Sequence, residues 1–343
     1  MTLAVALPNW VGDAVMATPA LRALRSRFPG ERLVAVVRPY IRPVLDPNPW
    51  TDEFIEMPKS AAGVWRAARQ LCCQRAAVGV LLANSARAAL VFYLGRVQRR
   101  VGYDRDARGL FLTDRVPAAK EGSEFVPTPQ ITAYLKLAEA VGAPAGDVRL
   151  ELFATAEDEA AARAAYEAAG LSPARTLLLC PGAAFGPSKG WPAPHWAALA
   201  RLARDKFDLE PAILCGPSEA GDAQAILAEA GGRCATFHDK GITLASARAV
   251  VKAARAMVAI DSGLRHYAAA FDKPVVALFG PTDIRWTETW HRKEVRLQGL
   301  VPCGPCQQPI CPSGTTECMW KITPQEALDA LAEALRRDQA RTA

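Results

Sequence analysis

Residues 3–24 read LAVALPNWVGDAVMATPALRAL, and this stretch decides the fold of the chain. Its first five residues are an apolar run typical of a strand, PNWVGD holds the Pro and Gly of a tight turn, and apolar residues return at helical spacing in AVMATPALRAL. The stretch therefore predicts a strand, a loop and a helix. Asp13 falls at the carboxyl end of the predicted strand.

Asp13 supports two interpretations. Open α/β sheets bind ligands outside the carboxyl ends of their strands, and a carboxylate there, next to a glycine that lets a ligand approach the backbone, is a candidate general base. Asp is equally common at helix starts, where it caps the helix. The stretch by itself leaves both interpretations open.

Strand and helix patterns alternate along the rest of the chain, which predicts parallel sheets covered by helices. The fold class is therefore α/β, with two Rossmann-like lobes facing a central cleft. We place the lobes at 1–153 and 154–322, followed by a C-terminal segment, 323–343, whose helix 324–337 packs back on the first lobe. The expected strands are 33–37, 78–82, 176–180, 212–215, 257–260 and 275–279, and the expected helices are 61–74, 86–94, 132–141 and 156–169.

Composition narrows the class of protein. The 343 residues are 50% hydrophobic and 22% charged, which is typical of a globular chain with about two domains. The net charge of +6 favours an acidic ligand or an anionic membrane surface, but the basic residues are too spread out for a nucleic-acid partner. The apolar segment 78–95 contains Arg87, which costs about 2.5–3.5 kcal/mol inside a bilayer, so we interpret it as buried core. Without a visible signal peptide, we expect a cytoplasmic protein.

An Arg-rich segment, RVGYDRDARG at 100–109, lies between two predicted elements of the first lobe. It is either a solvated loop or a basic surface beside Asp13 that receives an anionic substrate.

Two loops of the second lobe follow apolar strands. PGAAFGPSKGWP, at 181–192, lacks the spacing of a nucleotide-hydrolase phosphate loop, but its Lys189 can neutralise a phosphate. CGPSEAGD, from Cys215, places Glu219 where a carboxylate accepts both hydroxyls of a ribose.

A third loop, Asp261-Ser262-Gly263, opens the helix LRHYAAAF. Backbone N–H groups and the positive end of a helix dipole suit a diphosphate without any metal. The alternative is that Asp261 or Ser262 only caps the helix.

Four cysteines, Cys303, Cys306, Cys311 and Cys318, lie in one Pro- and Gly-rich segment. In a reduced cytoplasmic protein they fit a structural thiolate site for zinc or iron, acting as a staple for the C-terminal helix far from the chemistry. The second pair is spaced more widely than in common zinc sites, so the alternative is a loose set of thiols.

The stretches LPNWVGDAVMATPALRALR, RVGYDRDARGLFLT, PGAAFGPSKGWP, AIDSGLRHYAAA and KPVVALFGPTD together resemble the lipopolysaccharide heptosyltransferases of glycosyltransferase family 9, and most closely the heptosyltransferase II type. The resemblance covers essentially the whole chain. It implies a GT-B enzyme that transfers L-glycero-D-manno-heptose from ADP-heptose to the first heptose of the inner core on lipid A. It further implies that the anomeric centre is inverted and that no catalytic metal or other cofactor is required.

The resemblance also implies roles for individual residues. One departure from the family pattern is Gly190, where a basic residue is common. The implied roles are Asp13 as base, Lys189 as phosphate contact, Glu219 as ribose ligand, Asp261, Ser262 and Gly263 as the donor-binding turn, and His266 as a further donor-side residue.

Rival interpretations stay open. A family 9 enzyme with another donor or a protein acceptor would share these motifs, and a nucleotide-sugar-binding or metal-sensing module would need no base such as Asp13. A dehydrogenase is disfavoured because no G-x-G-x-x-G follows the first strand. We expect a monomer whose partners are ADP-heptose and a lipid A–core acceptor, with peripheral association at the inner membrane.

Overall fold

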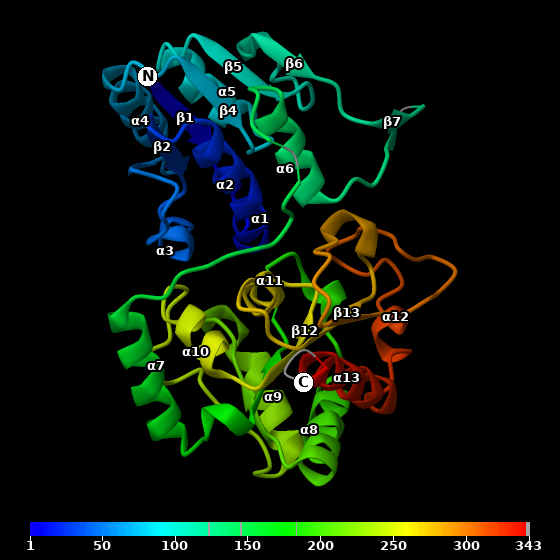
Figure 1. Ribbon diagram of the computed structural model, residues 1–343. Helices are drawn as coiled ribbons and strands as arrows, with labels where there is room; N and C mark the ends of the chain where they lie inside the picture. The colour runs from blue at the N-terminus through cyan, green and yellow to red at the C-terminus, as the bar shows by residue number, and fades with distance from the viewer. Residues whose placement is uncertain (123, 145, 183, 341–343) are drawn as a thin grey trace. The chain divides into compact units, whose positions relative to one another are not determined.

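The computed structural model describes residues 1–122, 124–144, 146–182 and 184–340. Residue 183 of the expected loop 181–192 and residues 341–343 of the expected C-terminal segment lie outside this range. The chain divides into two compact units, Met1–Phe153 with Arg285–Thr289, and Ala154–Ile284 with Trp290–Ala343. Each unit contains a parallel six-stranded sheet with helices around it (Figure 1).

The sheet of the first unit has the order β3-β2-β1-β4-β5-β6. The winding direction therefore reverses between β1 and β4, and such a switch point is where open α/β sheets bind ligands. A separate antiparallel pair, β7 and β8, follows the sheet. The strands are β1 (Thr2–Ala6), β2 (Arg32–Val37), β3 (Glu53–Glu56), β4 (Val78–Leu81), β5 (Arg99–Tyr103), β6 (Asp114–Val116), β7 (Lys120–Glu121) and β8 (Glu124–Phe125).

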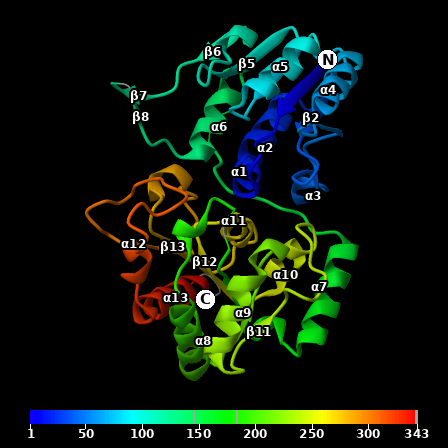
Figure 2. The same ribbon diagram turned by 180° about the vertical axis from the view of Figure 1, so that it is seen from behind.

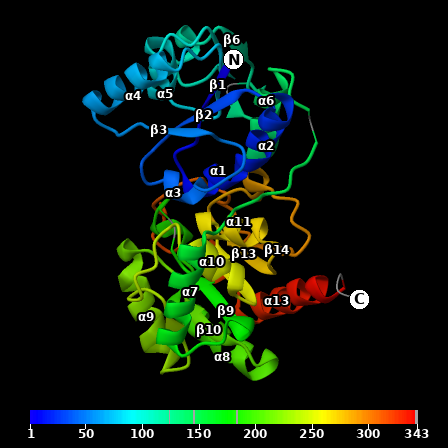
Figure 3. The ribbon, with the colours of Figure 1, turned by 60° about the vertical axis from the view of Figure 1, so that its left-hand side comes forward.

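Helices cover both faces of this sheet. Helices α4 and α5 pack together on one face, and α2 packs with α6 on the other (Figure 3). The helices of the unit are α1 (Val11–Met16), α2 (Thr18–Arg27), α3 (Arg42–Leu45), α4 (Ala61–Cys73), α5 (Ala86–Leu94), the short 3-10 helix η1 (Gly109–Phe111) and α6 (Gln130–Glu139).

The single helix expected after the first strand is two helices in the structure. Helix α1 ends at Met16, and α2 begins at Thr18 with Pro19 in its first turn. Proline has no N–H to continue the hydrogen-bond ladder of a preceding helix, but it fits well in a first turn. The break at Ala17 follows from Pro19.

The second unit repeats the same strand order, β11-β10-β9-β12-β13-β14, so its switch point lies between β9 and β12. Strands β9, β12 and β13 are buried along their whole length. Parallel strands covered on both faces are nearly continuous apolar runs, which is why the sequence reveals them. The strands are β9 (Thr176–Cys180), β10 (Glu210–Ile213), β11 (Ala235–Thr236), β12 (Ala256–Ile260), β13 (Val275–Phe279) and β14 (Glu294–Gln298).

The helices of this unit form two packed groups, α8 with α9 and α13, and α10 with α7 and α11 (Figure 2). Helix α7 has the expected bounds, because Thr155 and Asp158 form a capping box and Gly170 ends it with a φ of 65°. The helices are α7 (Ala156–Ala169), η2 (Pro173–Arg175), η3 (Pro187–Lys189), α8 (Ala193–Phe207), η4 (Pro217–Glu219), α9 (Ala220–Ala230), α10 (Ala247–Ala253), α11 (Gly263–Ala270), α12 (Glu317–Trp320) and α13 (Pro324–Gln339), and η5 (Ile284–Thr287) spans a unit boundary.

Helix α13 belongs to the second unit and packs there on α8, β13 and β14. Its apolar stripe, which includes Leu328 and Leu331, joins the core of that unit. Among the described residues, no helix combines the length and hydropathy needed to span a membrane.

Candidate active site

Two loops of the second unit meet at its switch point. Lys189 follows β9, and Asp261 follows the neighbouring strand β12. The Lys189 Nζ donates to the Asp261 carboxylate at 2.6 Å and to the Asp261 backbone carbonyl at 2.9 Å. Both side chains are nearly buried, so the two loops are joined by a buried ion pair.

Asp261 is the centre of a larger polar network. Its carboxylate also accepts from Arg265 at 3.3 Å and from Thr282 at 2.8 Å, and Arg265 in turn pairs with Glu294 at 2.5 Å. Burial alone would raise the pKa of Asp261, but the charges of Lys189 and Arg265 outweigh it and hold the pKa well below its usual range. Asp261 is therefore ionised at neutral pH.

Sequence reasoning missed three members of this network, Arg265, Thr282 and Glu294. Arg265 lies four residues after Asp261, a spacing that allows an ion pair along a helix. The sequence could therefore have predicted the contact between Arg265 and Asp261. Nothing local connects Glu294, in strand β14, with Asp261.

The first turn of α11 holds polar atoms that have no hydrogen-bond partner. Ser262 occupies the N-cap position, but its hydroxyl makes no capping bond, and Asp261 is engaged by its ion pairs. The Ser262 Oγ and His266 Nδ1 are buried without a partner among the described residues. Burial, reinforced by the charge of Arg265, lowers the pKa of His266 well below its usual value, so its ring is neutral. Unpaired buried polar atoms beside a helix N-terminus suit an anionic ligand.

Glu219 lies against the loop that follows β9. It ends η4, and its carboxylate accepts from the backbone N–H of Gly216 at 2.7 Å. Gly182 allows this approach, because a Cβ at that position would overlap the Glu219 carboxylate. The structure thus brings Glu219 beside the loop of Lys189.

Gly182→Ala tests this arrangement. The added methyl group forces Glu219 away, and overpacking of this kind typically costs about 1–3 kcal/mol. The displaced carboxylate also loses its expected hydrogen bond to the nucleotide, so we expect the dissociation constant for ADP, measured by calorimetry, to rise about tenfold. The matched control is Gly221→Ala, because a Cβ at this helical position meets nothing. Equal ADP affinity in both variants would exclude a role for Glu219 in nucleotide binding.

The cysteine segment 303–318 is adjacent to the loop of Lys189, and the expectation that it lies far from the chemistry candidates is wrong. Ser188 donates its hydroxyl to the Gln308 carbonyl at 2.6 Å and its N–H to the Pro309 carbonyl at 3.2 Å. A Cβ at Gly186 would overlap Pro309. The segment therefore braces the residue next to Lys189.

The four cysteines are not arranged as a metal site. Among the described residues, no group of three or more His, Cys, Asp or Glu side chains could hold a metal ion. Burial raises the pKa of Cys318, and the other three cysteines raise it further, so their thiols lie within electrostatic range of it. Hydrogen bonds from the Ser313 hydroxyl and from backbone N–H groups at 313–316 lower the pKa of the half-buried Cys311 thiol to about 7.

In the first unit, Asp13 is the third residue of α1 and is half-buried. The N-cap residue of α1 is Trp10, so Asp13 does not occupy the capping position. Burial raises the pKa of Tyr134, on the adjacent helix α6, and the charge of Asp13 raises it further. Asp13 thus lies near the carboxyl end of β1, at the switch point of this sheet.

The segment 100–109 is largely structural. Arg108 is fully buried and donates to the carbonyls of Tyr103 and Ala83, and burial lowers its pKa to about 10. Arg100 donates to the Phe111 carbonyl at 2.6 Å. Arg105 instead lines a pocket of about 90 Å³. Of the arginines in this segment, mainly Arg105 is left to form the expected basic surface.

Comparison with known proteins decides the family. The model of glycosyltransferase family 9 (heptosyltransferase) matches residues 64–316. This chain belongs to glycosyltransferase family 9. Its two parallel six-stranded sheets are the GT-B-type fold of that family, and the chain is a glycosyltransferase.

Relatives match this family 9 chain along its whole length. Lipopolysaccharide heptosyltransferase 2 of Salmonella typhimurium is 29% identical and covers 98% of this chain and 99% of its own length. The protein of the same name from Escherichia coli is 28% identical and covers 99% and 100%. The solved structure of E. coli ADP-heptose LPS heptosyltransferase II has a TM-score of 0.81 at 26% identity, covering 99% of this chain and 100% of that one.

Proposed function

We propose that this chain transfers L-glycero-D-manno-heptose from ADP-heptose to the inner-core heptose of lipopolysaccharide, with inversion and without a catalytic metal. The observation that carries the proposal is the pairing of Lys189 with Asp261 at the N-terminus of α11, beside the unpaired atoms of Ser262 and His266. The full-length match to relatives named heptosyltransferase 2 supports the choice of donor and acceptor.

The four charges of Lys189, Asp261, Arg265 and Glu294 sum to zero, so they supply no net attraction for a diphosphate. Binding then depends on directed N–H groups. Asp261 engages two of the three N–H bonds that a lysine offers, which leaves a third for a phosphate oxygen. Backbone N–H groups at the start of α11, including that of Gly263, complete the diphosphate site.

In the proposed reaction, the unit around 1–153 binds the acceptor and the unit around 154–322 binds ADP-heptose. Asp13 removes the proton of the acceptor hydroxyl as its oxygen attacks C1 from the face opposite ADP. Lys189 and the N-terminus of α11 stabilise the charge that develops on the departing diphosphate. Glu219 accepts hydrogen bonds from the nucleotide ribose.

The acceptor assay tests this function. Purified protein is incubated with ADP-heptose and a panel of truncated lipopolysaccharides, and the masses of the products are measured by mass spectrometry. We expect one added heptose, and only on acceptors that already carry the first heptose. Transfer from another sugar nucleotide, or to a protein, would favour the rival family 9 enzyme. Tight ADP-heptose binding without any product would favour a binding module.

We further propose that a monomer acts in the cytoplasm at the inner membrane, since the acceptor is lipid-anchored. Transfer should be unchanged by EDTA, because the diphosphate contacts come from protein N–H groups. Inhibition by EDTA that magnesium reverses would instead assign the diphosphate charge to a metal.

A structural metal on the cysteine segment is a separate proposal. Four thiols fit zinc or iron chemically, but Cys303, Cys306 and Cys311 must close around Cys318 to form a ligand set. Protein purified under reducing conditions and without any chelator should then contain about one equivalent of metal. Cys303→Ser should lose it and melt at a lower temperature, and ADP affinity should fall too, because the segment braces Ser188. Metal-free protein with normal melting would exclude the site.

A further inference from the structure

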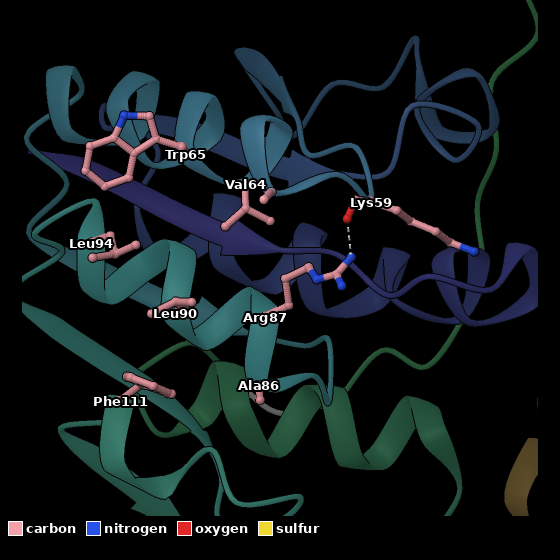
Figure 4. Close-up of a pocket in the computed structure, with 9 residues that line it drawn as sticks. Lys59, Val64, Trp65, Ala86, Arg87, Leu90, Leu94 and Phe111 are labelled. Atoms are coloured by element: carbon pink, nitrogen blue, oxygen red, sulfur yellow. Dashed lines mark hydrogen bonds between the residues drawn. The ribbon is translucent and has the colours of Figure 1, made fainter.

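An apolar groove of about 480 Å³ lies between α4 and α5 of the first unit. Val64, Leu90, Leu94 and Phe111 form its apolar lining, and Trp65 stands at its side with 59% of its surface exposed (Figure 4). Tyr93, whose ring contacts Phe111, is 51% exposed. Leu110, which directly precedes Phe111 in the sequence, is 83% exposed. This face of the sheet layer therefore presents apolar and aromatic groups to solvent.

All charged side chains of the segment that carries most of the groove are positive. Residues 57–103 contain eight basic residues and no Asp or Glu. Most of the basic side chains are exposed, and Arg99 alone among them has an ion pair within the described part of the chain, with Asp114. The eight are Lys59, Arg66, Arg69, Arg75, Arg87, Arg96, Arg99 and Arg100.

The basic and aromatic groups are interleaved. Arg66 and Arg69 flank Trp65 on the outer side of α4, with Arg69 one helical turn after Trp65. The Arg100 guanidinium lies 5.5 Å from the centre of the Tyr93 ring, which itself contacts Phe111. Lys59 and Arg87 line the groove itself, so these basic side chains are spread along it instead of converging on one point, as they would for a small anion.

We propose that this α4–α5 surface, made of the groove residues with Tyr93, Leu110 and the surrounding basic side chains, docks on an anionic phospholipid bilayer. Trp and Tyr side chains favour the membrane–water interface, where an apolar ring and a polar tip are both accommodated. Lys and Arg are attracted to anionic headgroups. The inference deepens the proposed function, because a lipid-anchored acceptor is presented at such a surface.

The test is co-sedimentation of the full chain with vesicles that contain no acceptor. We expect binding to vesicles of phosphatidylglycerol and phosphatidylethanolamine, little binding to phosphatidylcholine alone, and weakening by salt. Arg66→Glu combined with Arg69→Glu should lower the vesicle affinity at least about tenfold. Trp65→Ser should lower it at constant charge. The matched control is Arg163→Glu with Arg233→Glu, which makes the same charge change at exposed arginines of the second unit.

Transfer to a delipidated acceptor oligosaccharide separates this inference from the proposed function. The Arg66 and Arg69 variant should keep wild-type rates in that assay, because neither residue belongs to the candidate site. Equal vesicle binding by this variant and the control, or no binding by the wild type, would overturn the docking surface while leaving the transferase proposal intact. Loss of binding in the variant with normal delipidated transfer would support it.

Discussion

Asp13→Asn will lower the turnover of heptose transfer by about 10²–10⁴-fold, the usual loss when a general base is removed. The amide keeps the shape of the carboxylate but cannot accept the acceptor proton. Because the proposed donor site lies in the second unit, ADP-heptose affinity should stay close to that of the wild type. Steady-state kinetics with a truncated lipopolysaccharide acceptor and calorimetry with ADP measure the two effects.

The matched control for Asp13→Asn is Glu139→Gln, the same carboxylate-to-amide change at an exposed position of α6. It should leave turnover unchanged. If Asp13→Asn retains near-normal turnover, Asp13 contributes only to the start of α1, as a favourable charge in its first turn.

The second large effect concerns the buried pair of Lys189 and Asp261. Lys189→Met removes the N–H donor that we propose for the leaving diphosphate, and we expect a loss of about 10²-fold or more in turnover together with weaker ADP binding. The remaining Asp261 carboxylate still accepts from Arg265 and Thr282, so the melting temperature should fall only moderately.

Asp261→Ala should behave differently. It leaves the buried Lys189 without a carboxylate partner, beside Arg265, which keeps only Glu294, and breaking a buried pair in this way costs about 3–5 kcal/mol. We therefore expect a much larger loss of thermal stability than for Lys189→Met, in addition to lost activity. Thermal unfolding of the two variants, with and without ADP, makes the comparison. Equal stability of both variants would contradict the network, and wild-type ADP binding by Lys189→Met would remove Lys189 from the donor site.

Much of the fold was predictable from the sequence for a simple reason. Strands β9, β12 and β13 are buried on both faces and appear as continuous apolar runs, and α7 carries its own start and stop signals at Thr155 and Gly170. The four edge strands β3, β6, β11 and β14 were missed, and so was the interior strand β5, which begins with two arginines. Strands such as EFIE and EVRLQ are only partly covered, so their polar residues hide the pattern.

The sequence by itself determined the residue types of the candidate site and the loops that carry them, because each loop follows an apolar strand within a few residues. Only the tertiary structure decided which of those residues meet. Lys189 and Asp261 are 72 residues apart, and they pair because β9 and β12 are neighbours at a switch point. Glu294 reaches Arg265, and Pro309 braces Ser188, for the same reason: strand order and loop packing are set by burial of the whole sheet, which no local pattern records.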